Sequence, residues 1–129
     1  MKLSFITCTY NRSQLLLKNI ESVLQQNFKN FEHYVIDDGS TDDTATVINK
    51  YKHIKYIKLN KNYGQPGAMY YSNVLKKVNG DYIMILDSDD YLLPNVKKII
   101  EIKIAKNKNV WSFSFDISSK KRKKLNFKK

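Results

Sequence analysis

The sequence is short of cysteine, of suitably spaced glycine and of long apolar runs, and each shortage excludes a class of protein. Its single cysteine, Cys8, excludes an internal disulfide framework and a cysteine-rich zinc site, and favours a reducing, cytoplasmic setting. No segment approaches the ~20 consecutive apolar residues of a membrane span, and the amino terminus lacks the features of a signal peptide. The four glycines form neither a G-x-G-x-x-G fingerprint nor a G-x-x-x-x-G-K-[ST] phosphate loop.

Positive charge is concentrated at the carboxyl terminus. The 129 residues carry a net charge of +11, and residues 118–129 include seven basic residues and no acidic one. Subtracting these seven charges leaves +4 for residues 1–117, which we expect to form one compact domain. Residues 118–129 are expected to be a disordered, solvated tail. The alternative is a peripheral contact between Lys120–Lys129 and an anionic membrane, with nucleic acid the less favoured partner.

Strand and helix patterns alternate along the chain. Strands are predicted at 2–9, 31–36, 54–59, 82–86 and 110–117, with helices at about 13–26, 40–51, 68–79 and 94–104. Ser13 or Asn11 is expected to cap the first helix, and Ser40 and Asp43 to form a capping box for the second. Lysines place strand 54–59 near an edge of the sheet. This order predicts an α/β fold with a mostly parallel sheet and helices on both faces.

One apolar run ends abruptly in acidic residues. Residues 82–86 are continuously apolar, which is typical of a strand buried on both faces of a parallel sheet, and Asp87, Asp89 and Asp90 follow at once. Open α/β sheets bind their ligands at the carboxyl ends of such strands. Carboxylates so close together repel one another unless a cation compensates, so the pattern predicts a divalent metal that bridges substrate phosphates. A solvated acidic loop is the alternative.

Two other loops should reach the same edge of a parallel sheet. The first offers hydroxyl groups, an aromatic ring, an amide and a cation, on Thr9, Tyr10, Asn11 and Arg12. The second offers the carboxylate of Asp38 beside a glycine that permits close approach. With Ser88 and the acidic residues, these groups meet the three needs of a nucleotide-sugar site, which are base, sugar and diphosphate.

Several of these residues also have a purely structural interpretation. Tyr10 could cover the core, and Asp38 could serve only to form a turn. Cys8 is expected to be a small core residue. His33 and His53 lack metal-ligand spacing and are expected to be structural or on the surface.

Five segments together resemble the amino-terminal, nucleotide-sugar-binding half of a family-two glycosyltransferase with the GT-A fold. The segments are residues 5–12, 22–26, 35–42, 62–64 and 80–90, and the resemblance covers about residues 2–105. It implies transfer of a sugar from a nucleoside diphosphate to the hydroxyl of a glycan or lipid-linked acceptor, in glycan or polysaccharide biosynthesis. It also implies a cytoplasmic protein, or one peripheral to the inner face of the membrane. Residues 1–117 would then be the donor-binding half of a GT-A domain.

The resemblance also implies roles for single residues. The loop from Thr9 to Arg12 would line the nucleotide pocket, with Ser88. Asp38 would accept a hydrogen bond from uracil if the donor is a UDP-sugar. Asp87 and Asp89 match a D-x-D motif, in which Asp87 would contact the ribose or the metal and Asp89 would ligate Mg²⁺ or Mn²⁺.

The sequence departs from the family pattern in two places. The helix after Asn-x-Gly often carries Ala-Arg-Asn in the family, but here the residues are Ala68, Met69 and Tyr70, so that cation is missing or replaced. The general base of inverting members lies in a region that has no counterpart before Lys129, so no catalytic residue is identified and the chain looks truncated. Two alternatives remain: a non-catalytic nucleotide-binding module, and an anionic-surface binder that works through its basic tail.

Overall fold

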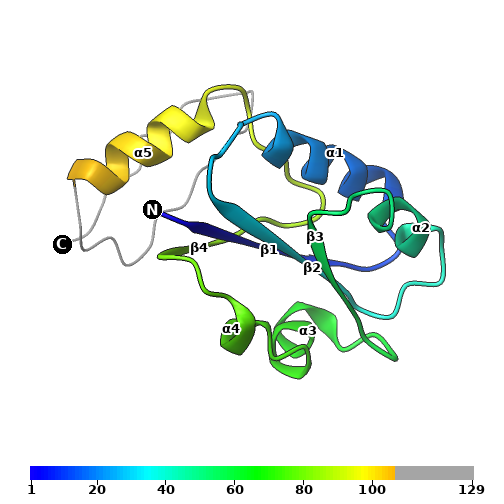
Figure 1. Ribbon diagram of the computed structural model, residues 1–129. Helices are drawn as coiled ribbons and strands as arrows, with labels where there is room; N and C mark the ends of the chain where they lie inside the picture. The colour runs from blue at the N-terminus through cyan, green and yellow to red at the C-terminus, as the bar shows by residue number, and fades with distance from the viewer. Residues whose placement is uncertain (107–129) are drawn as a thin grey trace, which may run out of the picture.

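The structure is a computed structural model that describes residues 1–106, and these form a parallel sheet with helices on both faces (Figure 1). The strands are β1 (Leu3–Thr9), β2 (Phe31–Asp37), β3 (Ile54–Lys58) and β4 (Tyr82–Ile85), in the order β3-β2-β1-β4. The helices are α1 (Ser13–Leu24), α2 (Thr44–Ile48), α3 (Gly64–Tyr71), α4 (Val74–Lys77) and α5 (Val96–Lys106). The predicted α/β fold with a parallel sheet is confirmed.

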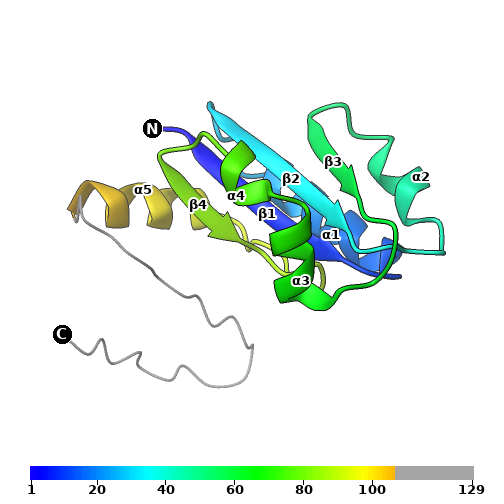
Figure 2. The ribbon, with the colours of Figure 1, turned by 90° about the horizontal axis from the view of Figure 1, so that it is seen from below.

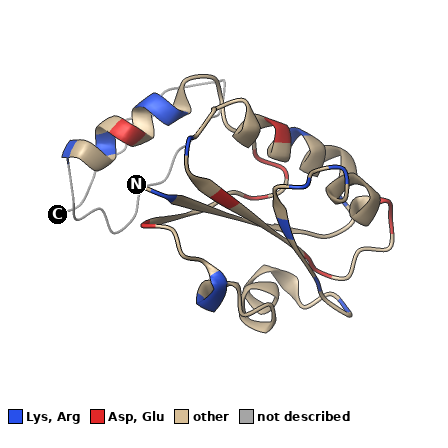
Figure 3. Cartoon of the chain, in the orientation of Figure 1, with Lys and Arg blue, Asp and Glu red and all other residues tan. Residues whose placement is uncertain are grey.

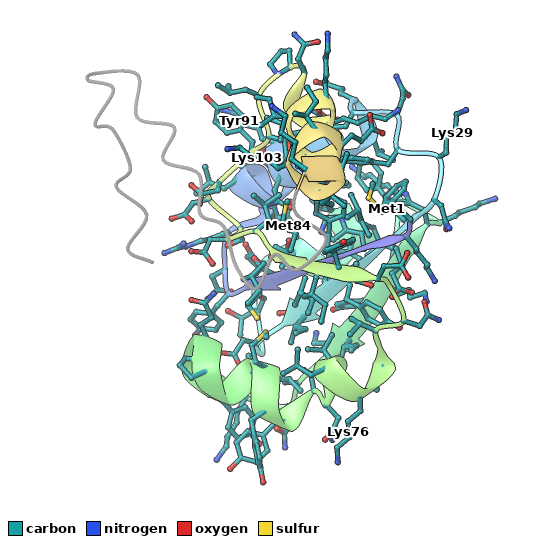
Figure 4. The ribbon with its side chains drawn as sticks, turned by 90° about the vertical axis from the view of Figure 1, so that its left-hand side faces the viewer. Met1, Lys29, Lys76, Met84, Tyr91 and Lys103 are labelled. Atoms are coloured by element: carbon teal, nitrogen blue, oxygen red, sulfur yellow. The ribbon has the colours of Figure 1, made fainter. Side chains whose placement is uncertain are left out.

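Two helical layers enclose the sheet. Helices α1, α2 and α5 cover one face, and α3 and α4 lie across the other (Figure 2). Successive side chains of a strand point to opposite faces, so Leu3 and Phe5 of β1 pack on the α1 and α5 side, whereas Ile6 packs on the α3 and α4 side. Each of these three side chains is at most 2% exposed, and burying one contributes about 1.5–3 kcal/mol. Figure 4 shows the layers, with α5 above the sheet and α3 and α4 below it.

Strand β4 differs from its prediction. We expected residues 82–86 to be buried on both faces, but Ile83 and Ile85 are 49% and 55% exposed. The reason is position: within residues 1–106, β4 pairs only with β1, and so it is an edge strand of the described sheet. The other edge is β3, as its lysines indicated.

The Asp42 carboxylate bonds to the first residue of both α1 and α2, since it accepts from the Ser13 amide and, at 3.0 Å, from the Thr44 amide. The residues before these helices are Arg12 and Asp43, and neither makes a side-chain cap, so the predicted caps at Ser13 or Asn11 and at Ser40 with Asp43 are wrong. Instead the Asp42 carboxylate accepts from the Ser13 amide at 3.3 Å. The two loops can bond in this way because β1 and β2 are neighbours in the sheet.

The single helix predicted over residues 68–79 is two short helices. Asn73 lies between α3 and α4 with φ of 53°, a left-handed conformation that asparagine tolerates better than most residues. Because of this turn, the residues that we expected on one apolar face do not all face the core. Val74 is buried, but Tyr71 and Leu75 are more than half exposed.

Helix α5 follows its prediction more closely. Its buried side chains, Val96, Ile100 and Ile104, repeat at intervals of four residues and pack in the same cluster as Leu3 and Phe5. The predicted strand at 110–117 and the basic tail at 118–129 lie outside the described residues.

Candidate nucleotide-sugar site

The sheet order creates a crevice beside β1. From β1 the chain proceeds outward through β2 and β3, and then returns to place β4 on the other side of β1. The loops after β1 and β4 therefore diverge, and such a switch point is where open α/β sheets bind ligands. A pocket of about 340 Å³ opens there, at the carboxyl ends of the strands. The predicted residues that line it are Thr9, Tyr10, Arg12, Asp38, Asp87, Ser88 and Asp89.

Asn11 is the predicted donor-binding residue that does not line the pocket. Its backbone is in the left-handed region, with φ of 49°, and its side-chain oxygen accepts from the amides of Thr41 at 2.8 Å and Asp42 at 3.3 Å. The backbone amide of Asn11 donates to the Ser40 hydroxyl at 3.0 Å. Asn11 thus joins the loop after β1 to the loop after β2, and it supports the pocket from beside it.

Asp38 forms a wall of the pocket and is 3% exposed. Its two carboxylate oxygens accept from the backbone amides of Tyr63 and Gly64, each at 2.9 Å. The adjacent Gly39, with φ of 80°, allows this approach, because a Cβ there would lie 2.6 Å from the carbonyl carbon of Lys61. The loop after β2 is therefore fixed to the segment that leads into α3.

The acidic loop faces donors from both sides of the pocket. The Arg12 guanidinium donates to the Asp89 carboxylate at 2.9 Å, and both side chains are about half exposed. The Gln65 side-chain amide, at the start of α3, donates to the Asp87 carboxylate at 2.7 Å. Arg12 is the sole cationic residue among those that line the pocket in the described part of the chain, and the α3 ribbon carries no charge (Figure 3).

The neighbouring carboxylates of this loop affect Asp90. Burial raises the pKa of Asp90, and the negative charges of Asp89 and Asp87 raise it further. Within residues 1–106, no three His, Cys, Asp or Glu side chains are grouped so as to hold a metal ion. An ion bound by Asp87 and Asp89 would therefore need further ligands, which substrate phosphates and water are able to supply.

Two residues at the end of β1, Cys8 and Thr9, line the pocket with side chains that are largely buried. Thr9 is 3% exposed, and its Oγ1 makes no hydrogen bond to any described residue. Beside it, burial raises the pKa of the Cys8 thiol to about 11, with the charges of Asp38 and Asp87 adding to the effect. The thiol therefore stays protonated at neutral pH. Cys8 packs against the apolar cluster on the α3 side as predicted, but it also lines the pocket, which the sequence did not indicate.

Three further lining residues were not predicted as site residues: Asn62, Gly64 and Gln65. Asn62 and Gly64 belong to segment 62–64, which is one of the five that carried the family resemblance, so the sequence could have indicated them as site residues. Nothing in the sequence indicated Gln65, because its contact with Asp87 joins residues 22 positions apart.

Comparisons with known proteins agree with this geometry. The model of the family described as glycosyl transferase family 2 matches residues 4–128. The UDP-Glc:alpha-D-GlcNAc-diphosphoundecaprenol beta-1,3-glucosyltransferase WfaP of Escherichia coli is 42% identical over 88 residues, which are 68% of this chain and 35% of the relative. The GalNAc(5)-diNAcBac-PP-undecaprenol beta-1,3-glucosyltransferase of Campylobacter jejuni is 43% identical over 96 residues, which are 71% of this chain and 31% of the relative.

A solved structure is similar over more of the chain. The structure of S. aureus TarS 1–349 in complex with UDP-GlcNAc superposes with a TM-score of 0.74 at 34% identity, covering 84% of this chain and 32% of that one. The chain spans about a third of the length of these relatives. The predicted GT-A-like fold is confirmed, and the chain belongs to glycosyl transferase family 2.

Proposed function

We propose that residues 1–117 bind a UDP-linked sugar together with Mg²⁺ or Mn²⁺, as the donor-binding part of a glycosyltransferase. The full reaction would move the sugar to a hydroxyl of a glycan or lipid-linked acceptor. The names of the similar E. coli and C. jejuni enzymes specify undecaprenol-linked acceptors, and the similar TarS was crystallised with UDP-GlcNAc. Donor-binding residues in this proposal are Thr9, Tyr10, Arg12, Asp38, Asp87 and Ser88, with Asn11 supporting the loop from beside the pocket.

One observation carries the proposal: the carboxylates of Asp87 and Asp89 and the guanidinium of Arg12 line the same pocket at the switch point of the sheet. Charged and polar side chains that line one pocket suit a ribose or a diphosphate better than an apolar ligand.

The donor set of the acidic loop fits a hard divalent cation. Mg²⁺ is commonly bound by one or two carboxylates together with substrate phosphates, and Asp87 and Asp89 offer such oxygens. When bound, the ion would act as a Lewis acid that stabilises the departing nucleoside diphosphate. The carboxylates of Asp87 and Asp89 would hold the ion. Ser88 between them is 3% exposed and also lines the pocket.

Arg12 is placed to exchange partners when the donor binds. Its ion pair with Asp89 is half exposed, and pairs of that kind contribute only about 0–1 kcal/mol, so the pair can separate at little cost. If Asp89 held a cation, the Arg12 guanidinium would be free to donate to the diphosphate. Arg12 would thereby supply the positive charge that α3 lacks in this chain.

The first test is calorimetry with UDP in the presence and absence of Mn²⁺. The wild-type chain should bind UDP more tightly with Mn²⁺, and Asp89→Ala should lose that dependence while its melting temperature stays close to wild type. Asp43→Ala is the matched control, because Asp43 is an exposed acid that does not line the pocket. Unchanged Mn²⁺ dependence in Asp89→Ala would exclude Asp89 as a ligand. A sugar-transfer assay would separate an enzyme from a non-catalytic nucleotide-binding module.

A further inference from the structure

A buried chain of hydrogen bonds connects the sheet to the backbone of the acidic loop. It consists of His33 on β2, Thr7 on β1 and Asn19 on α1, all with 0% of their surface exposed. The Asn19 side-chain nitrogen donates to the carbonyl oxygens of Asp87 at 2.9 Å and Asp90 at 3.0 Å. Both hydrogens of this amide are therefore directed at the acidic loop.

The orientation of that amide is fixed from behind. The Asn19 side-chain oxygen accepts from the Thr7 hydroxyl at 3.3 Å. The Thr7 hydroxyl has only one hydrogen, and it donates that hydrogen to Asn19. Its oxygen must therefore accept the hydrogen on Nε2 of His33, at 3.0 Å. Burial, helped by the charge of His53, lowers the pKa of His33 to about 3, so the ring is neutral at physiological pH and carries its hydrogen on Nε2. The chain of donors runs in one direction, from His33 to the loop.

The two carbonyls bound by Asn19 enclose the proposed metal ligands. The Asp90 amide also donates to the Asp87 carbonyl at 2.9 Å, so residues 87–90 form a closed turn. Asn19 fixes both ends of this turn through backbone atoms alone. The carboxylates of Asp87 and Asp89 take no part in this contact, and they project into the pocket, where Gln65 and Arg12 reach them.

Ser22 of α1 and Gln26, in the turn that follows the helix, continue this contact along the chain. Ser22 and Gln26 follow Asn19 at helical spacing. The Ser22 hydroxyl accepts from the Leu92 amide at 2.9 Å, and the Gln26 side chain donates to the Leu93 carbonyl at 2.9 Å. These two contacts lie farther from the carboxylates, so Asn19 is the residue that controls the turn itself.

We propose that Asn19 is a positioning residue for donor binding. It fixes the backbone of residues 87–90 so that the carboxylates of Asp87 and Asp89 are presented together to the cation and the diphosphate. This role rests on the proposed function. Replacing the partner that orients a metal ligand typically weakens metal affinity by about 10–100-fold, and Asn19 orients both ligands at once.

The test is Asn19→Ala in the 129-residue chain, with UDP and Mn²⁺ affinity measured by calorimetry. We expect the affinity to fall by about tenfold or more, at the lower end of the range for such orienting partners. The control is Ile20→Val, which removes a buried methylene from the neighbouring residue but leaves the turn untouched, since Ile20 packs against Leu16, Val35 and Ile48. Equal losses in both variants, or no loss in Asn19→Ala, would overturn the role.

A second variant and a ligand-free measurement guard against misfolding. Thr7→Val keeps the shape of Thr7 and the donors of Asn19 but removes the hydroxyl that orients the amide, so its loss of affinity should be smaller. Hydrogen exchange at the Asp90 amide should accelerate in Asn19→Ala without any ligand, and unchanged exchange would overturn the role. A wild-type chain that failed to bind UDP would overturn the proposed function, and with it this role, whatever the exchange data showed.

Discussion

Both carboxylate oxygens of Asp38 already accept hydrogen bonds from the backbone, which gives this residue a structural role beside any contact with a ligand. The sequence indicated its place at a strand end and its neighbouring glycine. It could not indicate the amides of Tyr63 and Gly64, because these lie 25 and 26 residues away and reach Asp38 only after β3 has paired. A turn former and a ligand-binding residue are therefore not exclusive interpretations here.

Asp38→Ala should destabilise the fold as well as weaken donor binding. Removing the carboxylate leaves the partly buried Tyr63 amide without its partner, at a cost of about 1–3 kcal/mol. The Gly64 amide also loses a bond to Asp38 but keeps the one to the Asn62 side chain at 3.0 Å. Urea denaturation should show a lower midpoint with an unchanged slope, and Asp43→Ala, which removes an exposed acid, should be close to wild type. A midpoint equal to wild type, with UDP affinity reduced, would mean that the amides find water and that Asp38 acts mainly on the ligand.

At the scale of the elements, Glu32 joins the strands at the amino end of the sheet. This carboxylate is buried on β2 and accepts from the Ser4 hydroxyl of β1 at 2.6 Å, from Lys55 of β3 at 2.7 Å and from the Asn79 amide before β4 at 2.8 Å. Lys2 adds an ion pair at 3.3 Å. Burial alone would raise the pKa of Glu32, but the hydrogen bonds from Lys55, Ser4, Asn79 and Lys2 outweigh it and lower the pKa to about 2.

This depressed pKa predicts a specific pH dependence. The folded-state pKa lies below the ordinary value of 4.5, so the charged group contributes stability above pH 4.5, and this contribution is lost as the pH falls toward about 2. Glu32→Gln should therefore be less stable than wild type at pH 6, and the difference should narrow between pH 4.5 and 2. Urea midpoints of both proteins across this range provide the measurement. A difference that stays constant across this pH range would mean that the pKa of Glu32 is the same in the folded and unfolded states.

The elements show where sequence patterns suffice and where they fail. The four described strands were predicted nearly to the residue, because alternation and apolar runs are local properties. The edge position of β4 was not predicted, since it depends on which strands pair rather than on residues 82–86 themselves. The break at Asn73 was also missed, because an asparagine in a helical pattern does not reveal a left-handed backbone. The Asn19 contacts needed the packing of α1 against the acidic loop.

At the scale of the whole molecule, the described residues form a pocket at the carboxyl ends of the strands but no membrane segment. None of the helices within residues 1–106 has both the length and the apolar character needed to cross a bilayer. The charge pattern instead suggests a surface contact. Seven of the eleven net positive charges fall within residues 118–129, and each basic residue near an anionic membrane contributes about 1 kcal/mol.

Deleting residues 118–129 should therefore sharply reduce binding to vesicles that contain phosphatidylglycerol. Binding by the full chain should weaken steeply as salt rises, because the attraction is screened within about 10 Å at 0.1 M. Co-sedimentation at several salt concentrations measures both effects, and neutral phosphatidylcholine vesicles are the control for apolar adsorption. A chain of full length with the tail lysines and arginine changed to glutamine should behave like the deletion, which separates charge from chain length. If either variant bound the vesicles as well as the full chain does, the tail would not be the membrane contact, and the lysines of α4 and α5 would be the next candidates.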